Sequence, residues 1–313
     1  MNHLKVCFVG IGSIAKRHIR NLRTVCEEKS IELTIDAFRR SPDVIEGVDS
    51  IFCSITDVSD DYDMIFITNP TDMHLDSLTW FHDKGKHFFI EKPVVSFPQI
   101  EKAKGFKTRK DSIYYVACPL RYNAVIQYIK KNINPEDVIS VRSISSSYLP
   151  DWRPGQDYRE TYSAHKDMGG GVSIDLIHEW DYMTYLFGAP EKVYSLIGKK
   201  SKLEIDSDDY AIYIAEYKDK IAELHLDYFG RKTIREVQLF TKEDTIIGDI
   251  ATNKVTFMKS GEVIDFKEER DDFQKREIIH FFNMIEGTDK IEDGFHHGLQ
   301  ILELTQGTKG EVI

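Results

Sequence analysis

Residues 4–15 of the 313-residue chain read Leu-Lys-Val-Cys-Phe-Val-Gly-Ile-Gly-Ser-Ile-Ala, an apolar run followed at once by a glycine turn. The run predicts a buried strand, and the residues after the turn predict a helix that reaches about residue 28. Gly10 allows the tight turn, Gly12 leaves no Cβ between the backbone and a pyrophosphate, and Ala15 lets the helix lie close to the sheet. This pattern is typical of the βαβ opening of a dinucleotide-binding domain.

The predicted helix has one apolar face. Apolar residues recur every three or four positions, and basic residues fill the positions between them. Free N–H groups at the start of such a helix bind a pyrophosphate. We therefore expect cofactor contacts from Gly10, Gly12, Ser13, Ile14 and Ala15.

The second predicted strand, residues 31–38, ends in Arg39-Arg40-Ser41. An acidic residue at this place binds the ribose 2′-hydroxyl of NAD, whereas arginine suits the 2′-phosphate of NADP. Asp36 is the acidic candidate, but it lies two residues inside the strand. Arg39, Arg40 and Ser41 therefore favour NADP over NAD, with solvated loop charges as the alternative.

Composition and charge narrow the class of protein. The formal net charge of −11 opposes binding to nucleic acid or to anionic membranes. The four cysteines are scattered without CxxC spacing, which favours reduced buried thiols and predicts no metal site. No apolar run reaches the roughly 18 residues of a membrane span. Because residues 1–5 lead straight into the first strand and leave no room for a signal peptide, we expect a cytoplasmic protein.

Strands and helices alternate up to residue 117. Residues 64–68, 87–90 and 113–117 predict strands, and residues 72–84 predict a helix that Gly85 ends. Ser96 is expected to cap a helix that reaches about residue 110. Ligands bind beyond the carboxyl ends of such strands, so the loops at Asn69 and Lys92 should face a cofactor crevice.

The pattern changes in the second part of the chain. Alternating β-rich runs between about residues 138 and 266 predict a largely antiparallel sheet, and helices follow at about 273–285 and 296–306. The length also suggests two domains. We predict an α/β domain with a doubly wound parallel sheet over residues 1–118, and an α+β domain with a largely antiparallel open sheet over residues 119–313.

Several motifs together resemble the Gfo/Idh/MocA family of oxidoreductases. They are the glycine turn, Pro70-Thr71 with His74, the block GKHFFIEKP at 85–93, and the glycine run at 169–171. The resemblance covers nearly the whole chain and implies a Rossmann domain followed by a substrate domain, whose open sheet often forms a homodimer or homotetramer interface. It implies cofactor contacts from Asn69, Pro70, Thr71, His74, Glu91 and Lys92.

Lys92 is the first candidate catalytic residue. The resemblance places it beside the nicotinamide and the substrate, and implies a cis bond between Lys92 and Pro93. A lysine there can donate a hydrogen bond to a substrate oxygen and stabilise the negative charge that develops on it. The alternative is a surface lysine at a strand end.

Asp175 and His178 follow the glycine run. They are predicted to lie on neighbouring parts of one helix face. The resemblance makes His178 the general acid/base for the substrate hydroxyl, with Asp175 beside it. The family usually places the aspartate four residues before the histidine, whereas here it lies three before, and Asp181 is the acid three residues after. A structural histidine and an acid at a helix start are the alternatives.

The stretch 148–163 is dense in aromatic and basic residues, which suit stacking on a sugar and pairing with phosphate or carboxylate. It is similar to loops in family members linked to surface-polysaccharide and nonulosonate sugar pathways. A loop anchored by its own aromatic residues is the alternative, and for Arg121 a structural ion pair. The candidate substrate contacts are Arg121, Trp152, Arg153, Tyr158, Arg159 and Tyr162.

These observations together predict an NAD(P)-dependent oxidoreductase. It would transfer a hydride between the nicotinamide and a hydroxyl or carbonyl carbon of a sugar or sugar derivative, such as a nucleotide-linked or acidic sugar. A lyase or hydrolase that oxidises its substrate transiently with bound NAD(P) is one alternative. A non-catalytic dinucleotide-sensing regulator is another.

Overall fold

The computed structural model describes residues 2–292 and 294–309. These residues divide into two compact units, with boundaries after Ala117, Glu269 and Gln300. Residues 270–300 therefore pack with the N-terminal unit, whereas the sequence analysis assigned them to the second domain. The apolar face of a helix predicts burial, but it does not say which sheet the helix will cover.

The first unit contains a parallel sheet. Among the described residues it has six strands in the order β3-β2-β1-β4-β5-β6, so the strand order reverses next to β1. Both faces of the central strands are buried, which explains their continuous apolar runs. The strands are β1 (His3–Val9), β2 (Glu32–Phe38), β3 (Ser50–Phe52), β4 (Tyr62–Ile67), β5 (Gly85–Ile90) and β6 (Tyr114–Val116).

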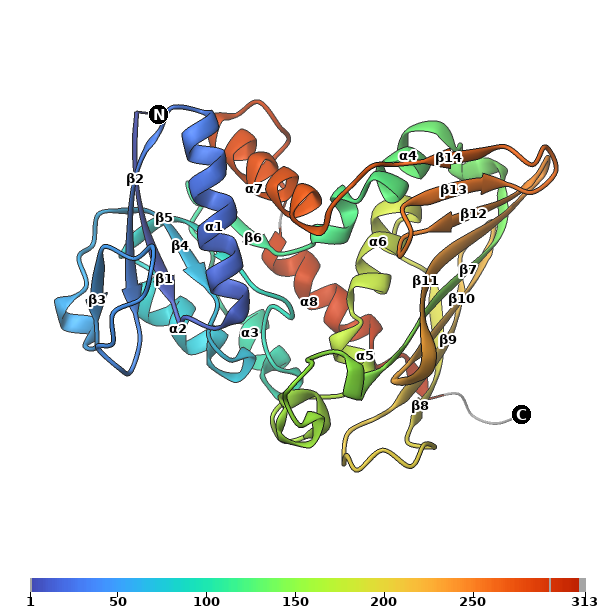
Figure 1. Ribbon diagram of the computed structural model, residues 1–313, viewed down its shortest axis with the longest axis horizontal. Helices are drawn as coiled ribbons and strands as arrows, with labels where there is room; N and C mark the ends of the chain where they lie inside the picture. The colour runs from blue at the N-terminus through green and yellow to red at the C-terminus, as the bar shows by residue number, and fades with distance from the viewer. Residues whose placement is uncertain (1, 293, 310–313) are drawn as a thin grey trace. The chain divides into compact units, whose positions relative to one another are not determined.

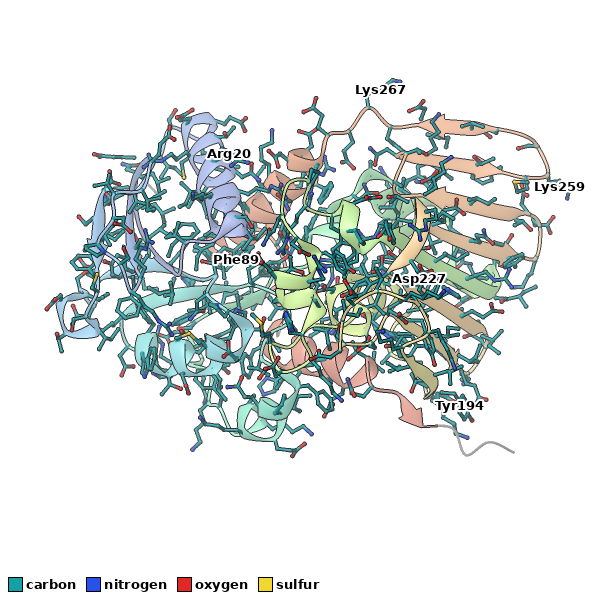
Figure 2. The ribbon with its side chains drawn as sticks, turned by 60° about the horizontal axis from the view of Figure 1, so that its bottom comes forward. Arg20, Phe89, Tyr194, Asp227, Lys259 and Lys267 are labelled. Carbon is teal, nitrogen blue, oxygen red and sulfur yellow. The ribbon has the colours of Figure 1, made fainter. Side chains whose placement is uncertain are left out.

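Helices α1 (Ser13–Glu28) and α7 (Arg270–Glu286) lie side by side in this unit (Figure 1). Ile19 and Leu22 of α1 share one buried cluster with Phe281 of α7 and with Phe89 of β5, which Figure 2 labels. The remaining helices of this part of the chain are α2 (His74–Phe81), α3 (Ile100–Lys104) and α8 (Gly294–Leu304), and the boundary after Gln300 falls within α8.

Two predicted helices are shorter than expected. The helix after Asn69 becomes a 3₁₀ turn followed by α2, which ends at Phe81. Gly85 does not end that helix: it begins β5, where a Cβ would lie 2.4 Å from the Ile65 side chain. Ser96 forms the expected cap, reciprocated by Gln99, but the helix ends at Lys104 rather than near residue 110.

The second unit contains a larger, mostly antiparallel sheet, as predicted. In the described part of the chain it has nine strands in the order β14-β13-β12-β11-β7-β10-β9-β8-β15, of which the β7–β10 and β8–β15 pairs are parallel. They are β7 (Val138–Tyr148), β8 (Lys192–Gly198), β9 (Tyr210–Glu216), β10 (Ile221–Asp227), β11 (Phe229–Thr241), β12 (Thr245–Asp249), β13 (Lys254–Phe257), β14 (Val263–Asp265) and β15 (Thr308–Lys309).

Helices α4 (Ala124–Asn132), α5 (Val172–Asp175) and α6 (His178–Phe187) belong to the second unit. Trp180 of α6 is fully buried, and its ring packs edge-on against Tyr213 of β9. Burial alternates along β9, so one face of this strand is covered and the other is partly exposed.

Short 3₁₀ turns connect the longer elements. The turns are Ile55–Asp57, Thr71–Met73, Phe97–Gln99, Pro119–Tyr122, Pro135–Asp137, Leu149–Asp151, Tyr158–Glu160 and Tyr162–Ala164.

Among residues 2–292 and 294–309, no helix has the length and apolar character that crossing a membrane requires.

Candidate functional site

The glycine turn after β1 has the geometry that an anion site needs. Gly10 has φ +86°, and a Cβ there would lie 2.6 Å from Asn69 Cα, so glycine is required. Gly12 precedes α1, and a Cβ built on it would meet no heavy atom within 4 Å. No side chain of the described residues caps this helix start. Its first N–H groups, from Ser13 and Ile14 onward, suit an anion.

The acidic residue of β2 is turned into the fold. Asp36 is buried and accepts a hydrogen bond from the Tyr62 hydroxyl at 2.7 Å. The Asp36 carboxylate is therefore hydrogen-bonded inside the unit, which agrees with its position two residues inside the strand.

The end of β2 carries basic residues and one acid. Arg39 lies 3.9 Å from the Asp43 carboxylate, and the Ser41 hydroxyl donates a hydrogen bond to the same carboxylate. Arg40 is exposed, with its guanidinium 3.9 Å from the sulfur of Met73. Arg40 thus presents a positive charge at the carboxyl end of β2.

Lys92 is the second residue after β5, and its bond to Pro93 is cis, as expected. The carboxylate of Glu91 accepts a hydrogen bond from the Lys92 N–H at 3.2 Å and lies 2.5 Å from Nε2 of His18. Burial alone would raise the pKa of Glu91. The hydrogen bond from His18 and the positive charge of Lys92 outweigh it and hold the pKa below its ordinary value.

His74 joins the two loops that were expected to face the cofactor. Its Nδ1 lies 3.1 Å from the Pro93 carbonyl oxygen, and its Nε2 lies 2.9 Å from the Asn69 carbonyl oxygen. The ring is only 1% exposed, and burial lowers its pKa. Both ring nitrogens face backbone carbonyl oxygens, and the neutral ring can donate to one side only. The cofactor contact expected of His74 stays a prediction. Pro70 and Thr71 follow Asn69 at the same edge of the sheet.

In the second unit, Asp175 ends α5 and His178 begins α6. The single predicted helix is therefore interrupted between them. The Tyr228 hydroxyl donates a hydrogen bond to Asp175 at 2.6 Å. The charge of Asp175, together with burial, raises the pKa of Tyr162, so this tyrosine stays protonated near neutral pH. His178 itself is half-buried.

The glycine run is packed against the protein's own chain. A Cβ on Gly170 would lie 2.1 Å from the Tyr162 carbonyl oxygen, and one on Gly171, at φ +130°, would lie 2.2 Å from Asp208. Asp208 also accepts a hydrogen bond from the Ser173 N–H at 2.9 Å. These glycines therefore bring Tyr162 and the start of α5 close together.

The aromatic and basic loop is held by short-range contacts and by contacts to residues 204–207. Trp152 donates to Ser147 at 2.9 Å, and the Arg153 guanidinium lies 5.3 Å from the centre of the Tyr162 ring. Arg159 pairs with Asp157 at 2.7 Å and with Glu204 at 2.8 Å.

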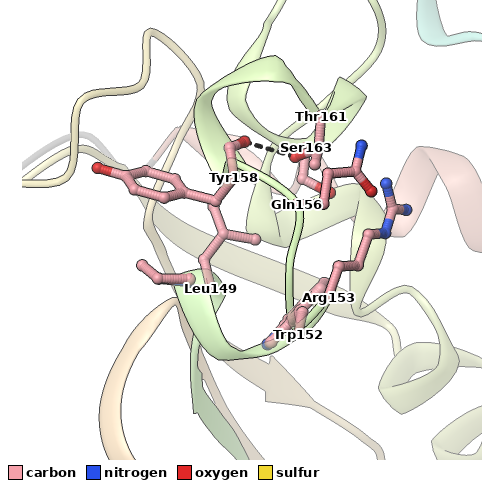
Figure 3. Close-up of a pocket in the computed structure, with 8 residues that line it drawn as sticks. Leu149, Trp152, Arg153, Gln156, Tyr158, Thr161 and Ser163 are labelled. Carbon is pink, nitrogen blue, oxygen red and sulfur yellow. Dashed lines mark hydrogen bonds between the residues drawn. The ribbon is translucent and has the colours of Figure 1, made fainter.

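The loop encloses a small pocket, shown in Figure 3. Its volume is about 10 Å³, enough for about one water molecule and too small for a sugar. It is lined by Leu149, Pro150, Trp152, Arg153, Gln156, Tyr158, Thr161 and Ser163.

Arg121 is a partner of Asp181. Its guanidinium donates two hydrogen bonds to the Asp181 carboxylate, at 2.9 and 2.7 Å, and both side chains are buried. The pair matches the structural alternative that the sequence left open for Arg121. It also gives Asp181, three residues after His178, a defined role in fixing α6.

Sequence reasoning missed three residues at these places. His18 lies on the apolar face of α1, and a histidine at an apolar position is a signal that could have identified it. Tyr228 and Asp208 reach Asp175 and α5 from distant strands and loops, so no local pattern indicates them. In the part of the chain that is described, no group of three or more histidine, cysteine or acidic side chains could hold a metal ion.

Comparisons with known proteins agree with this architecture. Residues 4–117 match a family described as an oxidoreductase family with an NAD-binding Rossmann fold, and residues 126–246 match the GFO/IDH/MocA C-terminal domain. Levoglucosan dehydrogenase of Pseudarthrobacter phenanthrenivorans is 25% identical over 206 residues, which cover 60% of this chain and 52% of that protein. An uncharacterized oxidoreductase of Bacillus subtilis, YrbE, is 24% identical over 188 residues, covering 58% of this chain and 53% of that protein. The chain thus spans about half the length of the curated relatives it matches.

Solved structures show the same fold. A levoglucosan dehydrogenase in complex with NADH superposes with a TM-score of 0.83 at 16% identity, covering 97% of this chain and 95% of that one. The UDP-N-acetylglucosamine 3-dehydrogenase GnnA from Acidithiobacillus ferrooxidans superposes with a TM-score of 0.77 at 18% identity, covering 98% of this chain and 96% of that one. The resemblance drawn from the motifs is confirmed: the chain belongs to the Gfo/Idh/MocA family of oxidoreductases.

Proposed function

We propose that the protein is an NAD(P)-dependent dehydrogenase or reductase that acts on a CH–OH group of a sugar or sugar derivative. The observation that carries this proposal is the loop of Lys92, which is attached through Glu91 to α1 and through Pro93 to His74. It lies at the carboxyl edge of the parallel sheet, where the glycine turn also opens. Relatives named as sugar and sugar-nucleotide dehydrogenases support the substrate class.

The residues after β1 fit a dinucleotide. Open space in front of Gly12 and the uncapped start of α1 suit the pyrophosphate. A bound dinucleotide would supply the acceptor or donor of the hydride. We propose NADP rather than NAD, because Asp36 is held by Tyr62 and Arg40 is exposed at the end of β2.

The chain's own residues would then handle the substrate oxygen and its proton. The Lys92 ammonium donates a hydrogen bond to the oxygen and stabilises the negative charge that develops there. His178 takes or returns the hydroxyl proton. Asp175 orients His178, and the hydrogen bond that Asp175 accepts from Tyr228 fixes the position of its carboxylate.

Substrate recognition is assigned to Arg153 and Tyr162. The Tyr162 ring is 38% exposed and carries the Arg153 guanidinium beside it. An aromatic face suits a sugar ring, and a guanidinium suits a phosphate or carboxylate on it. Trp152 bonds Ser147 and the Tyr158 hydroxyl accepts the Glu204 N–H, so these two side chains support the loop. A nucleotide-linked or acidic sugar is therefore the proposed substrate.

The outer face of the large sheet is the proposed contact in a homodimer or homotetramer. Tyr194 and Leu196 of β8 are 38% and 61% exposed, and they lie opposite Ile214 and Ile212 of β9. Figure 2 labels Tyr194. Light scattering should give a multiple of the 36.3 kDa chain mass, and Leu196→Asp should lower it while Lys259→Ala should not.

The function is tested by following reduced-nicotinamide absorbance with NAD and NADP, in both redox states. The substrates are nucleotide sugars, free sugars, polyols and acidic sugars. We expect turnover with one of them and a higher kcat/KM with NADP, and Arg40→Ser should reduce the preference for NADP by about tenfold. Tight dinucleotide binding with no absorbance change on any substrate would contradict the proposal. It would favour the bound-cofactor lyase or hydrolase, or the regulator.

A further inference from the structure

Glu91 is attached on two sides. One carboxylate oxygen lies 2.5 Å from Nε2 of His18, and the other accepts the N–H of Lys92 at 3.2 Å. Because Glu91 is ionised and can only accept, Nε2 of His18 carries the proton of this hydrogen bond. The carboxylate therefore connects a side chain of α1 to the backbone of Lys92.

His18 makes no other hydrogen bond that the described residues provide. The residue is 1% exposed, and its Nδ1 is buried without a partner in that part of the chain. The ring packs against Phe89 and Phe66, with centroids 5.0 and 5.9 Å away. A polar group in such surroundings is costly unless its hydrogen bond compensates. The single bond to Glu91 is thus the polar contact that accounts for a histidine at this place.

The position of His18 on its helix is informative. It lies in the second turn of α1, the helix whose uncapped start is the proposed pyrophosphate site. A displacement of α1 would be transmitted through one hydrogen bond to Glu91 and through a second to Lys92.

We propose that His18 is a positioning residue for Lys92, acting through Glu91, so that the helix that binds the dinucleotide also sets the place of the lysine. This inference rests on the proposed dehydrogenase function. His18 acts through Glu91 and is not proposed to contact the substrate.

The connection has a consequence for pH dependence. The hydrogen bond from His18 lowers the pKa of Glu91, so Glu91 stays ionised below its ordinary pKa of 4.5. When His18 can no longer donate, burial dominates and the pKa of Glu91 rises. In a variant that lacks this donor, the acidic limb of the pH profile of kcat should then move to higher pH.

The test compares His18→Phe, which keeps an aromatic ring against Phe66 and Phe89, with His18→Gln, which keeps a donor. We expect His18→Phe to lower kcat by about 10- to 100-fold, with KM and the dinucleotide Kd within about threefold. Its acidic limb should shift upward by about one pH unit. His18→Gln should remain within about threefold of the wild type. If His18→Phe does not fold, His18→Asn replaces it, because its amide is too short to reach Glu91.

Two measurements on the NADP-bound protein need no substrate. The ¹³C carboxyl signal of Glu91 should titrate at a higher pH in His18→Phe but not in His18→Gln. The rate at which an amine-reactive reagent labels Lys92 should likewise change in His18→Phe but not in His18→Gln. Equal Glu91 titrations in all three proteins, equal turnover in His18→Phe and wild type, or a failure of His18→Gln to restore turnover would overturn the inference. A wild type without turnover on any sugar would count against the proposed function alone, since titration and labelling would still decide whether His18 positions Lys92.

Discussion

The loop at residues 91–94 and the loop at residues 149–163 are held in opposite ways. In the first, Glu91 is bound by His18, which is 73 positions away in the sequence, and the carbonyl groups that follow Lys92 face His74, 19 and 20 positions away. In the second, Arg159 pairs with Asp157 two positions away, and Trp152 bonds Ser147 five positions away. The first loop is attached to helices α1 and α2, whereas the second combines such short-range pairs with contacts to residues 204–228, so several bonds share in holding it.

This difference determines how far a substitution should act. A loop anchored by distant helices changes its geometry when an anchor is lost, and the functional group that it carries moves with it. A loop held by local pairs can lose one of them with little effect elsewhere. The predictions below test this difference, in order of decreasing effect.

Lys92→Met should have the largest effect. Loss of the ammonium removes the stabilisation of negative charge on the substrate oxygen, so turnover should fall by about 100-fold or more while dinucleotide binding is retained. Steady-state kinetics and a binding titration measure the two quantities. Lys86→Met is the matched control, because Lys86 lies on β5 and pairs with Asp63 at 68% side-chain exposure. Unchanged turnover in Lys92→Met would remove Lys92 from the mechanism.

Glu91→Gln should have the next largest effect. It weakens the link between His18 and the Lys92 backbone, so we expect turnover about tenfold lower and a free energy of unfolding lower by about 1–3 kcal/mol at pH 7. Because the folded-state pKa of Glu91 lies below its ordinary value of 4.5, this stability difference should be complete above that pH and disappear as the pH falls through the folded-state pKa. Urea unfolding at several pH values measures it. A difference that persisted unchanged in acid would contradict the assignment of the lowered pKa.

Tyr228→Phe should have a moderate effect. Tyr228 anchors the second loop through its carbonyl, which accepts the Leu149 N–H at 2.9 Å, and through ring packing with Trp152. Its hydroxyl donates to Asp175 at 2.6 Å. The variant keeps the anchors and loses only the hydroxyl, so turnover should fall by about threefold to tenfold and stability by about 1 kcal/mol. An effect as large as that of Lys92→Met would show that Asp175 depends on Tyr228 for more than position.

Arg159→Ala should have the smallest effect. Arg159 is exposed, and both of its partners, Asp157 and Glu204, are carboxylates near the surface. We expect kcat and the thermal midpoint to stay close to the wild-type values. Arg153→Ala provides the comparison, because Arg153 lies beside Tyr162 and its loss should raise KM for an anionic sugar. A rise in KM for Arg159→Ala as well would restore Arg159 as a substrate contact.

The sequence was most informative where one local pattern sets both the backbone and the site. Gly10, Gly12 and the apolar face of α1 follow directly from residues 4–28, and the GKHFFIEKP block is specific enough to indicate the family from its residues alone. The alternation of β9 and β10 likewise predicted the antiparallel sheet.

Other features could not be predicted because their causes are distant in the sequence. The pairing of Arg121 with Asp181 spans 60 positions, and the hydrogen bond of Tyr228 to Asp175 spans 53. The positions of the basic loop residues also depend on which carboxylates lie near them, and a count of arginines does not contain that information. The surroundings of His74 show the same limit, since its motif position did not indicate that its ring nitrogens face the Asn69 and Pro93 carbonyl oxygens.

The membership of α7 in the first unit has a consequence for synthesis of the chain. Ile278, Phe281, Phe282 and Met284 of α7 belong to the same buried cluster as β1 and α1. A ribosome releases the parallel sheet early, but this cluster cannot close until about 150 further residues of the second unit have been made. A nascent or truncated chain that ends before residue 270 would present an open apolar surface to chaperones, so the N-terminal unit is completed late although its sheet is translated first.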